Sequence, residues 1–400
     1  MIIRFSPNDI LIITFIYNIG NMKKNYAWIW VLVALVVIGG AQYFSNQPSK
    51  PKTIGGLGDT NPITIGAVIS LTGPAGNQGE YIKKGMDLAM NEINNAGGMD
   101  GRKVKVLYED DKTDPKAGVS AFNKLTSVSN VNGIIGGLWD FTAQPLMPLA
   151  STNKIAFISP SNFRIEGGFD LNDQSFVMLT DFNKVIRGLQ DYLKQDNVKK
   201  IAVVHFKSTF GTEIAKTINQ VSVEIGKGQI IDEPYAGFGT NDYRTTIAKL
   251  KEAKADTVFL DMVDVDTVTF LTQAKALGFA PKFITYVGAY DAFTPANSSL
   301  LENIIVLNWQ TSTPDFINAY RKVYNADPAK SANNAYDAVF VLAEAIAKTK
   351  MNADVAGYIS SNIFNTVNGQ IQFLPTHEVS STPVEIDVYK GGALVPYKNQ

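Results

Sequence analysis

The chain has 400 residues, with 36 lysines and arginines against 37 aspartates and glutamates, and it contains no cysteine. This length predicts two or three domains with full hydrophobic cores. The balanced charge excludes the strongly basic surface of a nucleic-acid-binding protein, and the missing cysteine excludes disulfides, thiolate metal sites, a cysteine nucleophile and a lipidated cysteine.

The N-terminal segment predicts export of the chain. Residues 1–26 are expected to form a cytoplasmic N-terminus, although Met22, followed by two lysines, is also a conventional signal start, so that the true initiation codon could be here. Residues 27–45 hold the apolar run AWIWVLVALVVIGGA, whose length lies between a signal-peptide core and a membrane-spanning helix. Whether this run is an uncleaved anchor or part of a cleaved signal peptide, the residues that follow it would lie outside the cytoplasm. The remaining alternative is that the run forms a buried core helix. Residues 46–61 predict a flexible linker.

From Pro62 onward, short apolar runs alternate with helical patterns, which predicts an α/β fold with parallel sheets. The strand Ile63–Ile69 is followed by turn residues, a helix from about Gly79 to Asn95 and the strand Val104–Tyr108. In such folds the turns after the strands collect ligands. A second long helix is predicted over Ala332–Lys348. The other predicted strands are Gly133–Ile135, Ala156–Ile158, Ile201–Val204, Gln229–Asp232, Thr257–Leu260, Phe283–Tyr286 and Ile304–Leu307, and β runs without helices follow at Gly369–Phe373, Val384–Val388 and Ala393–Tyr397.

Motifs for catalysis are missing from the sequence. It has no HExxH, GxSxG, GxxxxGK[ST] or paired CxxC motif, and its two histidines, His205 and His377, are far apart. His205 could point into a cleft or simply close a strand. The acidic run that begins at Glu109 could hold a metal, or it could form a solvated loop in which Asp114 caps the helix that starts at Pro115. We therefore expect a binding protein without a cofactor, with a carboxylate-dependent hydrolase as a minor alternative.

A series of motifs resembles one known family. In chain order these are SLTGPAGNQGE, NEINNAGGMDGRKV, the acidic run with Asp114-Pro115, Gly136-Gly137 with Gln144-Pro145, Ile158-Ser-Pro160 and Phe210-Gly211. Over about Pro62–Tyr397 the chain resembles the extracytoplasmic solute-binding proteins of ABC transporters, of the leucine/isoleucine/valine-binding type. The resemblance implies the type I periplasmic binding fold, in which two Rossmann-like lobes are joined by a three-strand hinge, here preceded by the apolar anchor helix. Lobe 1 would hold residues 62–181 and 309–364, and lobe 2 residues 182–308 and 365–400, including the C-terminal β runs.

The resemblance also implies a ligand site between the lobes, where first-lobe hydroxyls and backbone N–H groups hold a carboxylate and a second-lobe acid holds an amine. This chain departs from that pattern: Asp140 and Phe163 replace a Ser and a Thr, Val287 replaces the acid, and Gln78 replaces an aromatic residue, whereas Phe210 keeps an aromatic. An aspartate at the carboxylate site would repel an anion unless it is protonated or turned away.

The candidate ligand residues combine uncharged hydrogen-bonding groups at first-lobe turns with three carboxylates and two aromatic rings. Trp139 could instead serve lobe packing, and Asp261, Asp264 and Asp266 could instead mark a helix N-terminus or take a cationic or hydroxyl-rich ligand. The predicted ligand-binding residues are Ser70, Thr72, Gln78, Trp139, Asp140, Ser159, Ser161, Asn162, Phe210, Asp261 and Asp264.

Together these features predict a monomeric binding protein on the extracytoplasmic face of the membrane, anchored or exported through its N-terminal segment. It would capture a small amino-acid-like solute, or a related amide, amine or polyol, by hinge closure and present it to an ABC permease. No nucleic acid partner is expected. A ligand-sensing module that feeds a separate signalling partner is the alternative function.

Overall fold

A computed structural model describes residues 61–165, 169–195, 197–309, 312–329, 331–349, 354–382 and 384–398. The predicted cytoplasmic segment and anchor, and all but the last residue of the predicted linker, lie outside these residues. Within the described part of the chain, no helix has the length and apolar character needed to cross a membrane.

The first lobe is built on a five-stranded parallel sheet in the order β2-β1-β3-β4-β5. The order reverses between β1 and β3, and the carboxyl ends of the strands at such a switch point are where open α/β sheets bind ligands. The first predicted strand is confirmed over its full length. The strands are β1 (Ile63–Ile69), β2 (Val104–Asp110), β3 (Gly133–Gly136), β4 (Phe157–Ser159) and β5 (Ser175–Val177).

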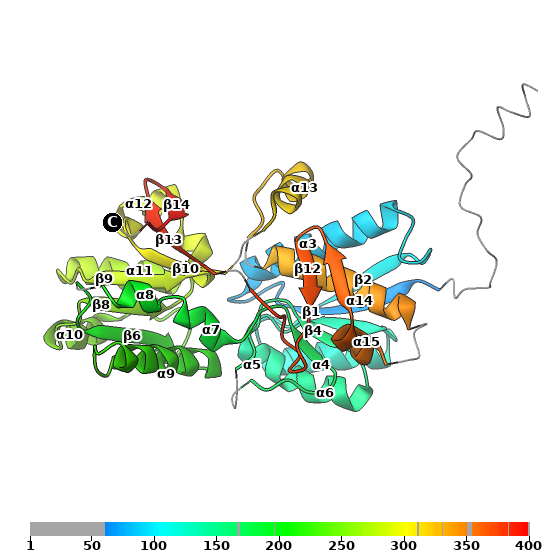
Figure 1. Ribbon diagram of the computed structural model, residues 1–400, viewed down its shortest axis with the longest axis horizontal. Helices are drawn as coiled ribbons and strands as arrows, with labels where there is room; N and C mark the ends of the chain where they lie inside the picture. The colour runs from blue at the N-terminus through cyan, green and yellow to red at the C-terminus, as the bar shows by residue number, and fades with distance from the viewer. Residues whose placement is uncertain are drawn as a thin grey trace, which may run out of the picture. The chain divides into compact units, whose positions relative to one another are not determined.

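Helices cover both faces of this sheet (Figure 1). On one face, α3 (Gly76–Asn95) and α14 (Ala332–Lys348) bury apolar side chains against β1. The predicted apolar face of α3 is confirmed, since its side chains at 82, 86, 89 and 93 are all buried. The opposite face is covered by α4 (Pro115–Ser127) and α6 (Met147–Asn153). The helix α4 begins as predicted, because the Asp114 carboxylate accepts the backbone N–H of Ala117 at 2.8 Å.

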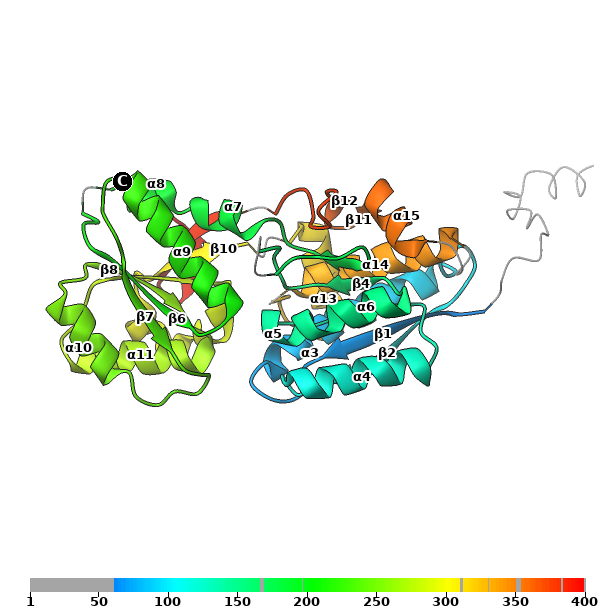
Figure 2. The ribbon, with the colours of Figure 1, turned by 90° about the horizontal axis from the view of Figure 1, so that it is seen from below.

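The second lobe is built on a seven-stranded mixed sheet in the order β14-β13-β10-β9-β8-β6-β7. Its central strands are parallel, while β13 pairs antiparallel with both β10 and β14. The helices α9 (Thr209–Glu224), α10 (Arg244–Glu252) and α11 (Asp264–Ala276) pack around this sheet (Figure 2). The strands are β6 (Ile201–Phe206), β7 (Ile231–Tyr235), β8 (Thr257–Asp261), β9 (Lys282–Tyr286), β10 (Ile305–Asn308), β13 (Glu385–Lys390) and β14 (Ala393–Pro396).

Shorter elements complete the two lobes. The chain passes from the first sheet to the second after β5, returns after β10 to form α14, and enters the second sheet again at β13, so three connections join the lobes. The shorter helices are α5 (Asp140–Ala143), η1 (Gln144–Leu146), α7 (Phe182–Arg187), α8 (Gln190–Leu193), η2 (Val287–Ala292), η3 (Pro295–Asn297), α12 (Ser298–Leu301), α13 (Pro314–Tyr324) and α15 (Val355–Ser361).

One predicted lobe boundary is wrong, because it divides the hairpin of β11 (Ile363–Thr366) and β12 (Gly369–Gln372) between the two lobes. The prediction placed residues from 365 onward in the second lobe. In the structure, Phe373 packs against Phe176 of β5 with ring centroids 5.1 Å apart, and the backbone of Glu378 pairs with that of Val177. The hairpin and the residues that follow it therefore belong to the first lobe, because Phe364 and Phe373 both pack into its hydrophobic cluster. Of the C-terminal strands described, β13 and β14 join the second sheet, whereas β11 and β12 pair with each other.

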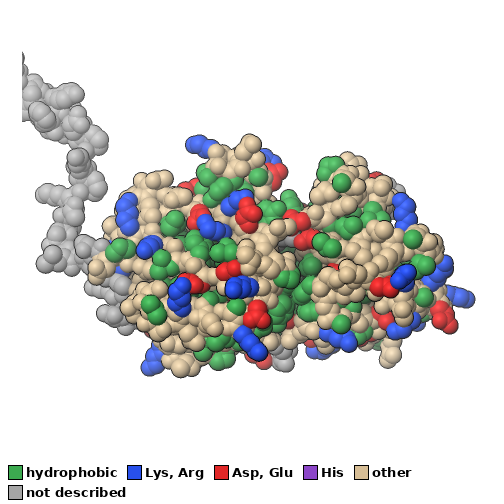
Figure 3. Space-filling model, turned by 180° about the vertical axis from the view of Figure 1, so that it is seen from behind, with side chains coloured by type: hydrophobic (Ala, Val, Ile, Leu, Met, Phe, Trp, Pro, Cys, Tyr) green, Lys and Arg blue, Asp and Glu red, His purple; other side chains and the backbone are tan. Residues whose placement is uncertain are grey.

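The surface carries charges of both signs. Lysine and arginine side chains lie among aspartates and glutamates across the described residues of the face in Figure 3. This mixture differs from the clustered basic charge of surfaces that bind nucleic acid.

Candidate ligand-binding site

A cavity of about 100 Å³ lies between the two lobes. Because about 10–15 Å³ on this measure accommodates one water molecule, the cavity has room for several waters or for a small solute. Its walls come from residues at or just beyond the carboxyl ends of parallel strands in both sheets, where α/β folds bind ligands. These segments follow β1, β3 and β4 in the first lobe and β6, β7, β8, β9 and β10 in the second.

Most of the predicted ligand residues line this cavity, and their contact with a ligand stays a prediction. The cavity-lining residues among them are Gln78, Trp139, Asp140, Ser161, Asn162, Phe210, Asp261 and Asp264.

Three predicted ligand residues lie outside the cavity lining and shape turns instead. Ser70 is fully buried and donates its hydroxyl to Asp111 at 2.5 Å. The hydroxyl of Thr72 donates to Asp110 at 2.6 Å, so both residues are engaged by the acidic run that was considered as a metal site. Ser159 donates to the carbonyl oxygen of Gly137 at 2.9 Å. Among the residues that the structure describes, no cluster of His, Cys, Asp and Glu could hold a metal ion.

A first aromatic wall of the cavity consists of Trp139, Phe206 and Phe238. The ring of Phe238 lies 4.5 Å from that of Trp139 and 4.2 Å from that of Phe206, measured between centroids. Trp139 comes from the first lobe and the two phenylalanines from the second, so this wall spans both lobes. The indole N–H of Trp139 donates to Gln78 Oε1 at 2.8 Å.

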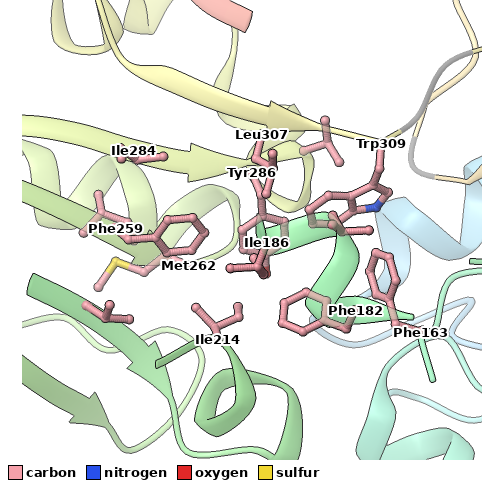
Figure 4. Close-up of a cluster of buried hydrophobic side chains, with 14 of the residues drawn as sticks. Phe163, Phe182, Ile186, Ile214, Phe259, Met262, Ile284, Tyr286, Leu307 and Trp309 are labelled. Carbon is pink, nitrogen blue, oxygen red and sulfur yellow. The ribbon is translucent and has the colours of Figure 1, made fainter. Parts of the chain in front are cut away.

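A second aromatic wall consists of Phe163, Phe210, Tyr286 and Trp309. Tyr286 and Trp309 stack with centroids 5.2 Å apart, and Phe163 meets Trp309 edge-on at 5.1 Å (Figure 4). Phe163 also stacks on Phe210 at 6.1 Å. The sequence reasoning missed Phe206, Tyr286 and Trp309 as site residues, although each ends or directly follows an apolar strand, and that position was the signal available.

Asp261 ends β8 and is 3% exposed. Its Oδ1 accepts the hydroxyl of Tyr286 at 3.0 Å, and its Oδ2 accepts the backbone N–H of Phe206 at 3.1 Å. Burial raises the pKa of Asp261 to about 6, while these hydrogen bonds and nearby His205 act in the opposite direction. Near neutral pH this carboxylate therefore carries a desolvated negative charge beside the cavity.

Asp140 is the first residue of α5 in the first lobe, and its carboxylate connects this lobe to the second lobe. Its Oδ2 accepts the backbone N–H of Phe210 at 2.9 Å, in the first turn of α9. Close by, the amide of Gln144 donates to the hydroxyl of Thr209 at 3.3 Å. Burial raises the pKa of Asp140, and the hydrogen bond from Phe210 counters that shift. A residue predicted to touch ligand thus also forms a hydrogen bond between the lobes.

Asp264 begins α11 and takes part in a second link between the lobes. Its Oδ1 accepts the backbone N–H of Asp291 at 2.9 Å. The carboxylate of Asp291 in turn accepts the amide of Asn77 at 3.2 Å and the hydroxyl of Tyr81 at 3.1 Å, both on α3. Hydrogen bonds therefore join the lobes at two separate places.

His205 does not line this cavity. Its Nε2 lies 3.0 Å from Asp232 Oδ1, and its Nδ1 lies 2.9 Å from the carbonyl oxygen of Phe206. Both ring nitrogens are engaged within the second lobe. His205 thus lies near the end of β6, and it also lines a second, open pocket together with Asp140 and Phe141 of the first lobe, so both alternatives for this residue fit the structure.

Comparisons with known proteins agree with this architecture. The chain is 27% identical to the Leu/Ile/Val-binding protein homolog 3 of Brucella melitensis biotype 1 over 346 residues, which cover 83% of this chain and 93% of the relative. It matches the structure of a branched-chain amino acid substrate-binding protein from Streptococcus pneumoniae in complex with isoleucine, with a TM-score of 0.73, 24% identity and coverage of 83% and 97% of the two chains.

A solute-binding protein from Rhodopseudomonas palustris in complex with benzoate also matches, with a TM-score of 0.73, 18% identity and coverage of 84% and 95%. At these identities the solved structures show a common fold. The sequence pattern of the family described as periplasmic binding protein matches residues 62–384. Because this match covers most of the chain, the protein belongs to the periplasmic binding protein family.

Proposed function

We propose that this protein is the substrate-binding component of an ABC importer, which captures a small solute between its two lobes and presents it to a membrane permease. The observation that carries the proposal is the cavity between the lobes, whose aromatic and polar walls come from both of them. A solute in that cavity would contact both lobes at once, as a binding protein requires.

Hinge closure is the mechanism that this arrangement supports. The first aromatic wall is divided between the lobes, and so are the hydrogen bonds from Asp140 and Asp291. Separation of the lobes would break these contacts and expose the cavity to water. A solute that bridges the walls binds the closed form better than the open form and shifts the equilibrium toward closure by that difference in affinity.

The family match supports a proposal for the location of the protein and for the solute that it binds. We propose that the described part of the chain works outside the cytoplasm as a monomer, held at the membrane or exported through residues 27–45. Relatives named for leucine, isoleucine and valine, and a matched structure with benzoate, support a small solute with an apolar body. The protein would need no cofactor and would release its solute unchanged.

A thermal-shift screen of the purified protein tests the proposal. The screen covers amino acids, amides, polyamines, organic acids and sugars. A solute that binds only the native state stabilises it, by about 2.7 kcal/mol when its concentration is a hundred times Kd. This added stability raises the melting temperature. Small-angle scattering should then show compaction with that solute. If no compound in the screen raises the melting temperature, or if the protein converts a compound chemically, the proposal fails.

A further inference from the structure

The cavity is rich in negative charge. Three carboxylates line it, from Asp140, Asp261 and Asp264, and none of the described residues in its lining is a lysine, arginine or histidine. Asp140 and Asp261 are 7% and 3% exposed, so water screens their charge poorly. Burial raises the pKa of each, and it outweighs the hydrogen bonds to both carboxylates and the opposing effect of His205 on Asp261.

Several side-chain hydrogen-bond donors of the cavity are directed to acceptors of the protein itself. In the first lobe, Ser161 donates to the carbonyl oxygen of Leu138 at 2.6 Å, and the amide of Asn162 donates to both Gly137 and Ser159. The indole N–H of Trp139 is likewise taken by Gln78. In the second lobe, the hydroxyls of Tyr235 and Tyr286 both donate to Asp261, the first to its carbonyl oxygen and the second to its carboxylate.

An anionic group would therefore meet three carboxyl groups, while many of the side-chain donors are already engaged, which makes its desolvation costly. A cationic group brings its own donors and finds carboxylate and amide oxygens to receive them. The faces of the two aromatic walls also attract a cation, because the aromatic ring quadrupole is negative above the ring. Charge, hydrogen bonding and aromatic surface thus all favour the same kind of solute.

We infer that the solute is a small organic ammonium ion, with an apolar body against the aromatic walls, a protonated amine directed at the carboxylates and no carboxylate of its own. This inference rests on the proposed function and narrows the solute class of the same cavity. A zwitterionic amino acid with the same side chain would bring an additional carboxylate into the acidic cavity.

Two matched pairs of compounds test the inference by isothermal titration calorimetry on the full-length protein in detergent. Isopentylammonium differs from leucine, and 2-phenylethylammonium from phenylalanine, only by the missing carboxylate. We expect at least one amine to bind ten times more tightly, or better, than its amino acid partner. As a check of charge alone, 2-phenylethanol should bind at least tenfold more weakly than 2-phenylethylammonium, and 3-phenylpropanoate should not bind.

The outcomes separate this inference from the proposed function. If leucine or phenylalanine binds as tightly as its amine or more tightly, or if a carboxylate binds, the ammonium class is overturned while a solute-binding function stands. If neither pair binds but an uncharged or anionic compound of the broad screen does, the inference of an ammonium solute fails, while the proposed solute-binding function stands. If nothing binds, the inference and the proposed function both fail.

A pair of variants tests whether the negative charge of a cavity residue strengthens ammonium binding. Asp264→Asn keeps an oxygen that can accept the backbone N–H of Asp291 but removes the charge, so it should weaken ammonium binding at least tenfold and leave 2-phenylethanol within twofold. Asp266→Asn is the matched control on the same helix turn, since Asp266 is outside the cavity lining and accepts from Tyr243 and Gly239. It should change ammonium affinity by less than threefold. Equal losses in the two variants would overturn the inference.

Discussion

The hydrogen bond from the backbone N–H of Phe210 to Asp140 predicts a measurable effect on closure. The two residues belong to different lobes and their atoms are 2.9 Å apart, with Asp140 only 7% exposed. In Asp140→Ala the amide of Phe210, at the N-terminal end of α9, loses a charged acceptor in the closed form, whereas water hydrates it in the open form. A hydrogen bond to a charged group contributes about 1.5–3 kcal/mol. The closed-to-open ratio should therefore fall by roughly tenfold to a hundredfold.

Single-molecule energy transfer between dyes on the two lobes measures that ratio directly. The closed population should fall in Asp140→Ala without any solute, and solute affinity should drop by a similar factor, since binding then has to offset the lost contact. Asp140→Asn keeps an acceptor oxygen and should fall between the wild type and the alanine variant.

Asp114→Ala is the matched control for this measurement. Asp114 also accepts a backbone N–H at the start of a helix, at 2.8 Å from Ala117, but both residues lie in the first lobe. Its loss should cost about 1 kcal/mol of folding stability and leave closure unchanged. An Asp140→Ala protein that closes and binds like the wild type would refute the role of this contact.

Three further effects follow from the structure. A Cβ at Gly85 would lie 2.0 Å from the carbonyl oxygen of Ala332, so Gly85→Ala should lower the free energy of unfolding in urea by about 1–3 kcal/mol, whereas Gly76→Ala on the same helix, with its nearest neighbour at 3.6 Å, should not. Burial raises the pKa of Asp337 to about 7, so the native state holds this proton more tightly and stability is lost as pH rises from 4 to 7; Asp337→Asn should match the wild type at pH 4 and melt at a higher temperature at pH 8. A chain that lacks residues 1–61 should stay in the aqueous phase of a detergent partition, and its retention with the membrane would contradict the predicted anchor.

The sequence alone was sufficient for the α/β layers, since strand and helix periods depend on local patterns. Ile63–Ile69 is a strand over its full predicted length, and the apolar spacing along α3 predicted the face that is buried. The cap at Asp114 was also predictable, because it depends on residues only three positions apart. The family resemblance, which rests on ordered motifs, was confirmed by the match over residues 62–384.

The composition of the site depended on the tertiary structure. Ser70 and Ser161 both follow first-lobe strands, yet Ser70 is fully buried against Asp111, whereas Ser161 lines the cavity while it donates to Leu138. Phe373 follows the hairpin of β11 and β12, and its packing against Phe176 helps to decide which lobe this part of the chain joins. Phe206, Phe238 and Trp139 are far apart in the sequence and form one wall only when the two lobes meet. Local patterns determine the elements and the ends of the strands, but the contacts that make a cavity connect distant segments, and no short-range pattern shows which of these segments meet.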